Sequence, residues 1–336
     1  MSGRPRDVSD GAFRNWHLTR GHNVETLEKT IGRGVSRRSF LAGVGTAATA
    51  SLVIGCGDNG TTTPPPTTPP TNPPTTPTIT DADVLNFALN LEYLEAEFYL
   101  RAATGNGLGT ADVGTSAGAV TGGTQVNWGT SALANYANEI AQDELTHVRF
   151  LRSALTAAGA TPVDRPQIDF TNAFSALAVA AGIISAGSTF NPFSSPSAFL
   201  VGAFVFEDVG VTAYSGAAPL LTSKTILSAA AGIQAVEAYH AAGIRTLLVS
   251  MAASTSDQTY VGYANKVSML RGTLGGGNET ALSVSSIVAA DTTNAIGFSR
   301  TTDQVLHIVY AAGAGVQTKG GFFPAGLNGT IKATAA

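Results

Sequence analysis

The sequence predicts an all-α fold built on a four-helix bundle. Long segments between residues 80 and 274 carry apolar residues at helical spacing, and a pattern of glutamate, tyrosine and histidine occurs twice along them. These roughly 195 residues of the 336 suffice for a sizeable core. We divide the chain into residues 1–55, 56–79, 80–274 and 275–336, because composition changes at each boundary.

Residues 1–55 are predicted to be an export signal and not part of the fold. A polar stretch leads to Arg37-Arg38 and then to an Ala/Gly-rich apolar run, which is the layout of a twin-arginine signal peptide. The run is too short to span a membrane as a stable helix. The alternative is a cytosolic basic patch beside a short buried helix. We expect the twin-arginine export machinery to be a partner and the protein to be periplasmic or on the cell surface.

Cys56 is the only cysteine of the sequence, so no disulfide forms within the chain. It follows Val53-Ile54-Gly55, which resembles the lipobox of bacterial lipoproteins, where an acylated cysteine becomes the new N-terminus. A free or buried thiol is the alternative. Acylation would anchor the protein to a membrane without a spanning helix. The Thr/Pro-rich residues 56–79 then form an extended tether.

The charge of the remaining chain argues against nucleic acid as a partner. Residues 1–55 hold eight of the 19 basic and four of the 23 acidic residues, which leaves 11 basic and 19 acidic residues and a net charge of −8. The basic residues are scattered singly, so no patch is built to bind phosphates. No later stretch is expected to span a membrane without polar interruption.

Each helix of residues 80–274 has a boundary signal. Residues 104–128 form a long loop, 160–169 connect, 170–187 form an apolar helical piece, and a further helix covers 256–274. Residues 275–336 are partly irregular, with a short helix over 303–313, and pack on the bundle as an extension. The four bundle helices run from Thr80 or Asp81 to Ala103, from Thr130 or Ser131 to Ala158, from Ser197 to a kink or end near Pro219, and from Thr222 or Ser223 to Ala253.

Two short patterns alternate along these four helices. The first is a glutamate with a tyrosine seven residues later, and the second is a glutamate with a histidine three residues later. Residues three or seven apart share a helix face. In a carboxylate-bridged two-metal site, two helices each provide one glutamate, and the other two helices each provide a Glu-x-x-His pair. The pairs are Glu92 with Tyr99, Glu144 with His147, Glu207 with Tyr214, and Glu237 with His240.

Buried carboxylates persist only when they are paired or coordinated, so a cluster of these six groups requires cations. Two divalent metal ions, iron or manganese, would compensate the charge. The alternative is that the Glu–His pairs are ordinary surface pairs. Both pairs lie among small or apolar neighbours in helix interiors, which favours the metal site.

Further polar residues lie near the proposed ligands. We choose Glu92 over Glu95 because Glu92 repeats the seven-residue spacing to a tyrosine; Glu95 is an outer group, an extra ligand or an exposed residue. Tyr99 and Tyr214 are predicted to orient a ligating carboxylate two turns away, or else are core tyrosines. Asp143 and Asp208 are expected in solvent or paired with Arg149, Arg152 or Arg245.

Residues 85–92 with Tyr99, and Asp143-Glu144-Leu145-Thr146-His147, resemble the first two bundle helices of bacterioferritin and rubrerythrin. Residues 81–272 as a whole are similar to exported ferritin-like proteins, which include desiccation-related proteins. The resemblance implies a ferritin-like up-down bundle with a long crossover between its second and third helices. It also implies the ligands Glu92, Glu144, His147, Glu207, Glu237 and His240.

The resemblance leads to one main functional hypothesis and two alternatives. The main hypothesis is an exported dinuclear iron or manganese protein that reacts with oxygen or peroxide in stress protection. The first alternative is a non-catalytic envelope or desiccation-stress scaffold with structural metal or none, and the second is a ferroxidase. The tether and the extension would hinder a storage cage, and no Cys-x-x-Cys pair exists for a rubrerythrin-type electron-transfer site.

Overall fold

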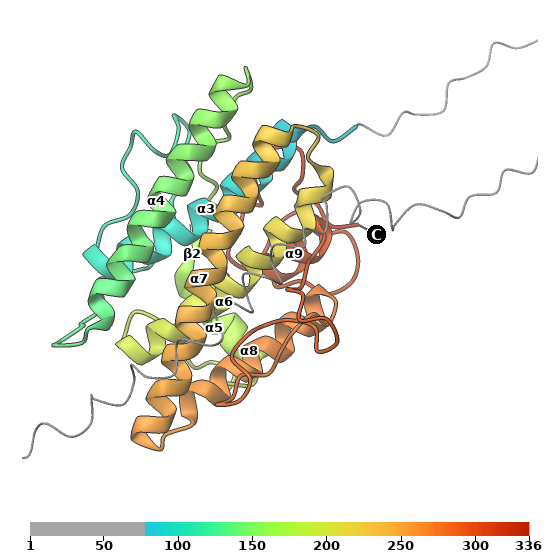
Figure 1. Cartoon of the computed structure of the whole chain (residues 1–336). Helices are drawn as coiled ribbons and strands as arrows, with labels where there is room; N and C mark the ends of the chain where they lie inside the picture. Colours follow the sequence, from blue (N-terminus) through green and yellow to red (C-terminus); the bar gives the residue numbers. More distant parts are fainter. Residues whose placement is uncertain (1–77, 336) are drawn as a thin grey trace, which may run out of the picture. The chain divides into compact units, whose positions relative to one another are not determined.

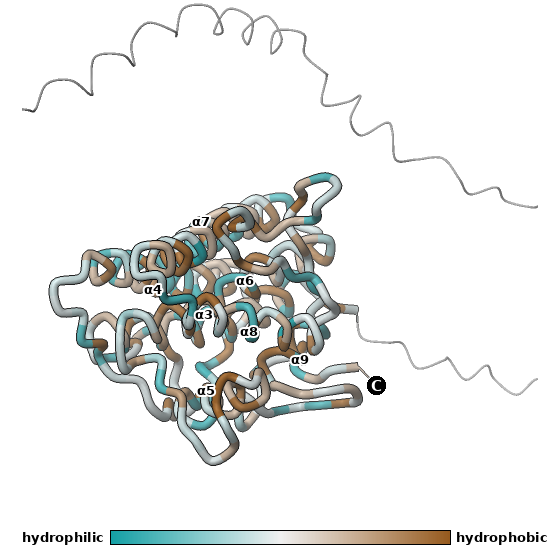
Figure 2. Tube along the Cα trace, turned by 90° about the horizontal axis from the view of Figure 1, so that it is seen from below, coloured by the Kyte–Doolittle hydropathy of each residue, from teal (hydrophilic) through white to brown (hydrophobic). Residues whose placement is uncertain are grey.

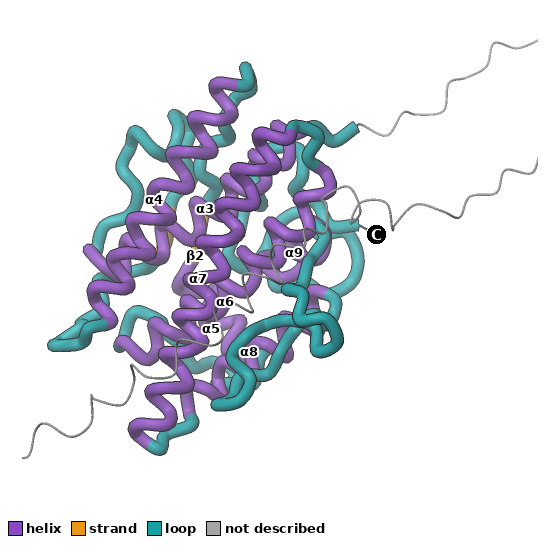
Figure 3. Tube along the Cα trace, viewed as in Figure 1, coloured by secondary structure: helices purple, strands orange, loops and turns teal. Residues whose placement is uncertain are grey.

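A computed structural model describes residues 78–335, so the predicted export signal, including Arg37 and Arg38, and Cys56 lie outside the described residues. The described part contains seven α-helices, one short 3-10 helix and one pair of two-residue strands (Figure 3). The prediction of an all-α fold is therefore confirmed. Strands β1 (Val120–Thr121) and β2 (Ile168–Asp169) pair in parallel, which joins the loop after the first bundle helix to the crossover.

Four long helices form the bundle (Figure 1). α3 packs mainly against α4, and α6 packs mainly against α7. The chain crosses from α4 to α6 through residues 158–195, as the family resemblance implied. The bounds are α3 (Asp81–Thr104), α4 (Leu133–Ala157), α6 (Pro196–Ala217) and α7 (Lys224–Thr255), and the crossover holds α5 (Phe170–Ala180).

Side-chain caps fix most of the helix ends. Thr80 begins α3 with a capping box, because its hydroxyl accepts from the N–H of Asp83 and the Asp83 carboxylate accepts from the N–H of Thr80. Ser223 caps α7, as predicted. α4 begins later than predicted: Ala132 occupies the cap position, and no side chain makes a cap hydrogen bond there.

α6 lies at the centre of the apolar core. The stretch Pro196–Leu220 has the length and apolarity of a membrane-crossing helix, but most of it is buried inside the bundle, as in the core helix of a globular protein. The helix ends at Ala217 and continues as the 3-10 turn η1 (Ala218–Leu220), which contains Pro219. Proline supplies no N–H to a continuing helix, so the predicted end near this residue agrees with the structure.

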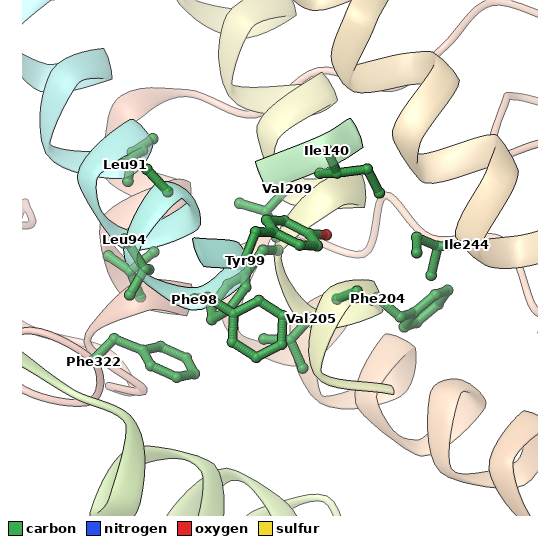
Figure 4. Close-up of a cluster of buried hydrophobic side chains, with 14 of the residues drawn as sticks. Leu91, Leu94, Phe98, Tyr99, Ile140, Phe204, Val205, Val209, Ile244 and Phe322 are labelled. Carbon is green, nitrogen blue, oxygen red and sulfur yellow. The ribbon is translucent and has the colours of Figure 1, made fainter. Parts of the chain in front are cut away.

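An aromatic cluster packs α5 against α3 and α6. Phe98 of α3 lies 5.7 Å from Phe174 of α5 and 5.2 Å from Phe206 of α6, measured between ring centroids. Figure 4 shows Phe98 and Tyr99 pointing from α3 into the core. Figure 2 shows α5 as strongly hydrophobic, which suits its place over this cluster. Aromatic pairs at these distances stabilise a core beyond the area they bury.

The last part of the chain packs on the bundle. After α8 (Thr259–Gly275), residues 276–335 are mostly loops around the short helix α9 (Thr302–Val309). The side-chain amide of Asn90 donates to the carbonyl of Asn328, and its oxygen accepts from the N–H of Asn328. Because Asn90 is fully buried in α3, this pair fixes the extension directly to a helix of the bundle.

Candidate metal centre

The six predicted ligands meet inside the bundle. α3 and α6 each contribute one glutamate, and α4 and α7 each contribute a glutamate and the histidine one turn later. All six residues are buried. Their potential ligand atoms form two overlapping groups, within each of which all atoms lie within 4.8 Å of one another: Glu92, Glu144, His147 and Glu237 in one, and Glu144, Glu207 and His240 in the other.

Local sequence explains why these side chains face inward. In α4, Ile140, Ala141 and Val148 are fully buried, so the helix face that carries Glu144 and His147 is the core face. The spacing of three residues then aligns the carboxylate and the imidazole one turn apart.

His147 approaches three carboxylates through one ring nitrogen. Its Nδ1 lies 3.2 Å from Oε2 of Glu92 and 3.3 Å from Oε2 of Glu144. The same nitrogen lies 3.6 Å from Oε1 of Glu237. The histidine of α4 thus joins carboxylates of α3, α4 and α7 at one point.

His240 has a similar environment with one addition. Its Nδ1 lies 3.1 Å from Oε1 of Glu144 and 3.5 Å from Oε2 of Glu207. Its Nε2 lies 3.1 Å from Oδ2 of Asp143 on α4. Asp143 is partly exposed, as expected, but its partner is the imidazole on α7, so the expected pair with an arginine is wrong.

The two tyrosines bond across the bundle. The hydroxyl of Tyr99 on α3 donates to Glu207 on α6, and the hydroxyl of Tyr214 on α6 donates to Glu92 on α3. Each tyrosine therefore orients a carboxylate, but of the other helix. Residues seven apart on one helix are separated by about 10 Å along its axis, so the neighbouring helix is within easier reach.

Glu95 is buried beside the cluster and is not exposed to solvent. It lines a small cavity of about 20 Å³, and the other lining residues are apolar or glycine. A Cβ atom placed on Gly210 would overlap Oε2 of Glu237 and lie 3.3 Å from Oε1 of Glu95. The absence of a side chain at this position of α6 leaves the space that both carboxylates occupy.

The electrostatics of the cluster are those of crowded buried acids. Burial and the charge of Glu92 raise the pKa of Glu144 to about 7. Burial and the charge of Glu144 raise the pKa of Glu237 well above its ordinary value. Burial alone would lower the pKa of His240, but the nearby carboxylates, chiefly Glu207, raise it to about 12. Without cations, protons held by imidazoles and carboxyls offset the negative charge.

The donor set fits divalent metal ions. Of seven buried side-chain nitrogen and oxygen atoms that lack a hydrogen-bond partner among the described residues, six belong to this cluster. Buried polar atoms without partners are rare and point to a missing ion or ligand. Mixed carboxylate and imidazole donors suit iron and manganese. The six atoms are Oε2 of Glu92, Oε1 of Glu144, Oε2 of Glu207, both carboxylate oxygens of Glu237, and Nδ1 of His240.

A buried network of arginines lies next to the cluster, behind α6. The carboxylate of Asp208 accepts from Arg245 at 2.9 Å and from Arg271 at 2.7 Å. Glu279 pairs with Arg271 at 2.8 Å and with Arg300 at 2.7 Å. The expected pair of Asp208 with Arg245 is present. Sequence analysis missed Arg271 of α8, and it missed Glu279 and Arg300 because no periodicity in the extension predicts their position.

The fold and the site define a class of protein: a four-helix bundle with a long crossover and a buried carboxylate–histidine cluster suited to metal ions. The sequence pattern described as "Ferritin-like domain" matches residues 80–250. The chain belongs to this ferritin-like family, and the resemblance found from its helices is confirmed.

Two relatives align with most of the chain. The desiccation-related protein PCC13-62 of Craterostigma plantagineum is 30% identical over 252 residues, which cover 69% of this chain and 78% of the relative. The ferritin-like catalase Nec2 of Nesocodon mauritianus is 28% identical over 273 residues, which cover 75% of this chain and 84% of the relative. This chain is similar to both along most of their length.

Proposed function

We propose that this protein binds two divalent metal ions, iron or manganese, in the bundle and uses them to break down peroxide outside the cytoplasm. The proposal rests mainly on the six buried carboxylate and imidazole atoms without hydrogen-bond partners. Peroxide is chosen as the substrate because a relative that covers 75% of the chain is named a ferritin-like catalase. The ligands would be Glu92, Glu144, His147, Glu207, Glu237 and His240, with Glu144 in both groups.

The reaction needs a two-electron exchange between two peroxide molecules. One hydrogen peroxide gives up two electrons and two protons and becomes O₂, and the other takes them up and becomes two waters. Bound iron or manganese would supply the change of oxidation state. The protein supplies fixed ligands and an environment from which bulk water is excluded.

Glu95 is suited to hold a proton in this reaction. Among residues 78–335, it is the only ionisable residue that lines the apolar cavity between α3, α6 and α9. Burial and the charges of Glu144 and Glu207 raise the pKa of its carboxyl well above the ordinary value in the metal-free protein.

Metal content and peroxide turnover test the proposal together. We expect two iron or manganese ions per chain after expression with supplemented metals, and release of O₂ from added hydrogen peroxide. Glu144→Gln should lose both, because Glu144 belongs to both groups of ligand atoms. The matched control is Glu139→Gln, an exposed residue of the same helix, which should keep both. A wild-type protein without stoichiometric metal overturns the proposal.

A second function is favoured by the relative named as desiccation-related. In that case the bundle is a non-catalytic envelope scaffold whose metal is structural. Metal binding that raises the melting temperature, with no turnover of peroxide or oxygen, would support this function. Rapid oxidation of ferrous iron without peroxide turnover would instead indicate a ferroxidase.

We further propose that the protein is exported through the twin-arginine machinery and held at a membrane by a lipid on Cys56. Support comes from the sequence: paired Arg37 and Arg38 precede a short apolar run, and Cys56 follows it directly. Peroxide outside the cytoplasm would then be the substrate available to the bundle.

A further inference from the structure

The two halves of the site differ in the residue that can hydrogen-bond the outer nitrogen of each histidine. The residue before Glu144 is Asp143, whereas the residue before Glu237 is Val236. Asp143 accepts from Nε2 of His240 at 3.1 Å. By the repeat, position 236 on α7 corresponds to Asp143, and valine cannot accept a hydrogen bond.

His147 therefore lacks the support that His240 has. Among residues 78–335, its Nε2 has no hydrogen-bond partner, and its side chain is 10% exposed, against 4% for His240. In two other respects the halves correspond. Both histidines turn Nδ1 towards the carboxylates. Glu92 and Glu207 each accept a hydrogen bond from a tyrosine hydroxyl of the opposite helix.

A carboxylate behind a ligating histidine has known consequences. It fixes the tautomer so that the other nitrogen presents its lone pair to the metal, it holds the ring orientation, and it raises the basicity of the ligand. Loss of such an outer partner typically weakens metal binding by about 10–100-fold.

We propose that the two metal positions are inequivalent, and that Asp143, as a positioning residue, makes the position at His240 the tighter one. This rests on the proposed metal site. Glu144 belongs to both groups of ligand atoms and Glu237 only to the group of His147, so the proposed order follows from the support of the imidazole and not from the number of carboxylates.

The test is a titration of the metal-free full-length protein with Mn²⁺, with bound and free ion measured at each step. The wild type should bind two ions in steps whose affinities differ by about 10–100-fold. Asp143→Asn should weaken the first step to about the level of the second and keep the final capacity of two. Val236→Asp should strengthen the weaker step.

Crystals grown with one Mn²⁺ per chain give a second readout. The anomalous diffraction signal of manganese should lie beside Nδ1 of His240. Glu139→Gln, on the same helix, is the control and should titrate like the wild type. An unchanged melting temperature of metal-free Asp143→Asn would exclude a merely structural role. No binding at all would defeat the proposed function. Two ions bound in indistinguishable steps, or a first ion at His147, would defeat only this inference.

Discussion

The hydroxyl of Tyr99 on α3 donates a hydrogen bond to the buried carboxylate of Glu207 on α6. The reciprocal bond runs from Tyr214 to Glu92, so the two helices exchange orienting groups. Burial and the nearby carboxylates raise the pKa of both tyrosines well above the ordinary value of 10, so both hydroxyls keep their protons and act as donors at neutral pH. The crossed bonds make the positions of Glu92 and Glu207 depend on the packing of α3 against α6.

Tyr99→Phe should therefore weaken metal binding without unfolding the bundle. The variant removes a hydrogen bond to a buried carboxylate and keeps the ring in the aromatic core, and loss of such an outer group costs about 10–100-fold in metal affinity. A metal titration of the variant measures the effect. The control is Tyr239→Phe, which changes a 76% exposed tyrosine of α7 and should have no effect. Equal affinity of Tyr99→Phe and wild type would contradict this role.

Gly210→Ala should disturb the cluster even though alanine is the better helix former. The added Cβ would overlap the carboxylate of Glu237, so this ligand must move. We expect fewer than two metal ions per chain by elemental analysis. Gly232→Ala is the matched control: it lies in α7 with no atom within 4 Å of an added Cβ and should stabilise the protein by about 0.5–1 kcal/mol. A normal metal content in Gly210→Ala would show that Glu237 is not needed in its present position.

Cys56→Ser tests the predicted anchor. An acyl chain on this cysteine would keep the protein in the membrane fraction, because lipid anchoring depends on its buried methylene groups. The variant should appear in the soluble fraction outside the cytoplasm, and labelled fatty acid should be incorporated only into the wild type. The double variant Arg37→Lys with Arg38→Lys should instead leave the chain in the cytoplasm. Membrane retention of Cys56→Ser would rule out the anchor.

The sequence predicted those parts of the site that depend on one helix at a time. Glu144 and His147 share a face because they are three residues apart, and the apolar neighbours show that this face is buried. The partners of Tyr99 and Asp143 could not be predicted, because they depend on the distance and rotation between two helices. Arg300 was missed for another reason: it follows a segment with no regular pattern, and only the folded extension brings it to α6 and α8.

The network around Asp208 should dominate the stability of the region behind α6. Asp208→Ala would leave Arg245 and Arg271, both about 1% exposed, without one of their carboxylates. Breaking a buried pair in this way costs about 3–5 kcal/mol. Chemical denaturation of the metal-free proteins would measure the loss. The control is Asp112→Asn, whose partner Arg149 is 58% exposed, and whose loss should change the stability much less. Equal losses in the two variants would contradict the ranking.

Glu279 should give the fold a dependence on acid pH. Burial alone would raise its pKa, but the charge of Arg271, aided by Ser268 and Arg300, outweighs burial and holds the pKa below the ordinary 4.5. A carboxyl with a depressed pKa contributes stability that is fully present above its unfolded value. That contribution is lost as the pH falls from about 4.5 through the folded pKa, because the unfolded chain takes up the proton first.

Glu279→Gln isolates this contribution. The variant should be less stable than wild type at neutral pH, and the difference in unfolding free energy should shrink as the pH falls below 4.5. Denaturant unfolding of both metal-free proteins between neutral and acid pH measures the difference directly, and the other carboxylates affect both proteins alike. A difference that stays constant across this range would mean that the charge of Glu279 does not stabilise the arginine network, and that its side chain acts there only by packing and hydrogen bonding.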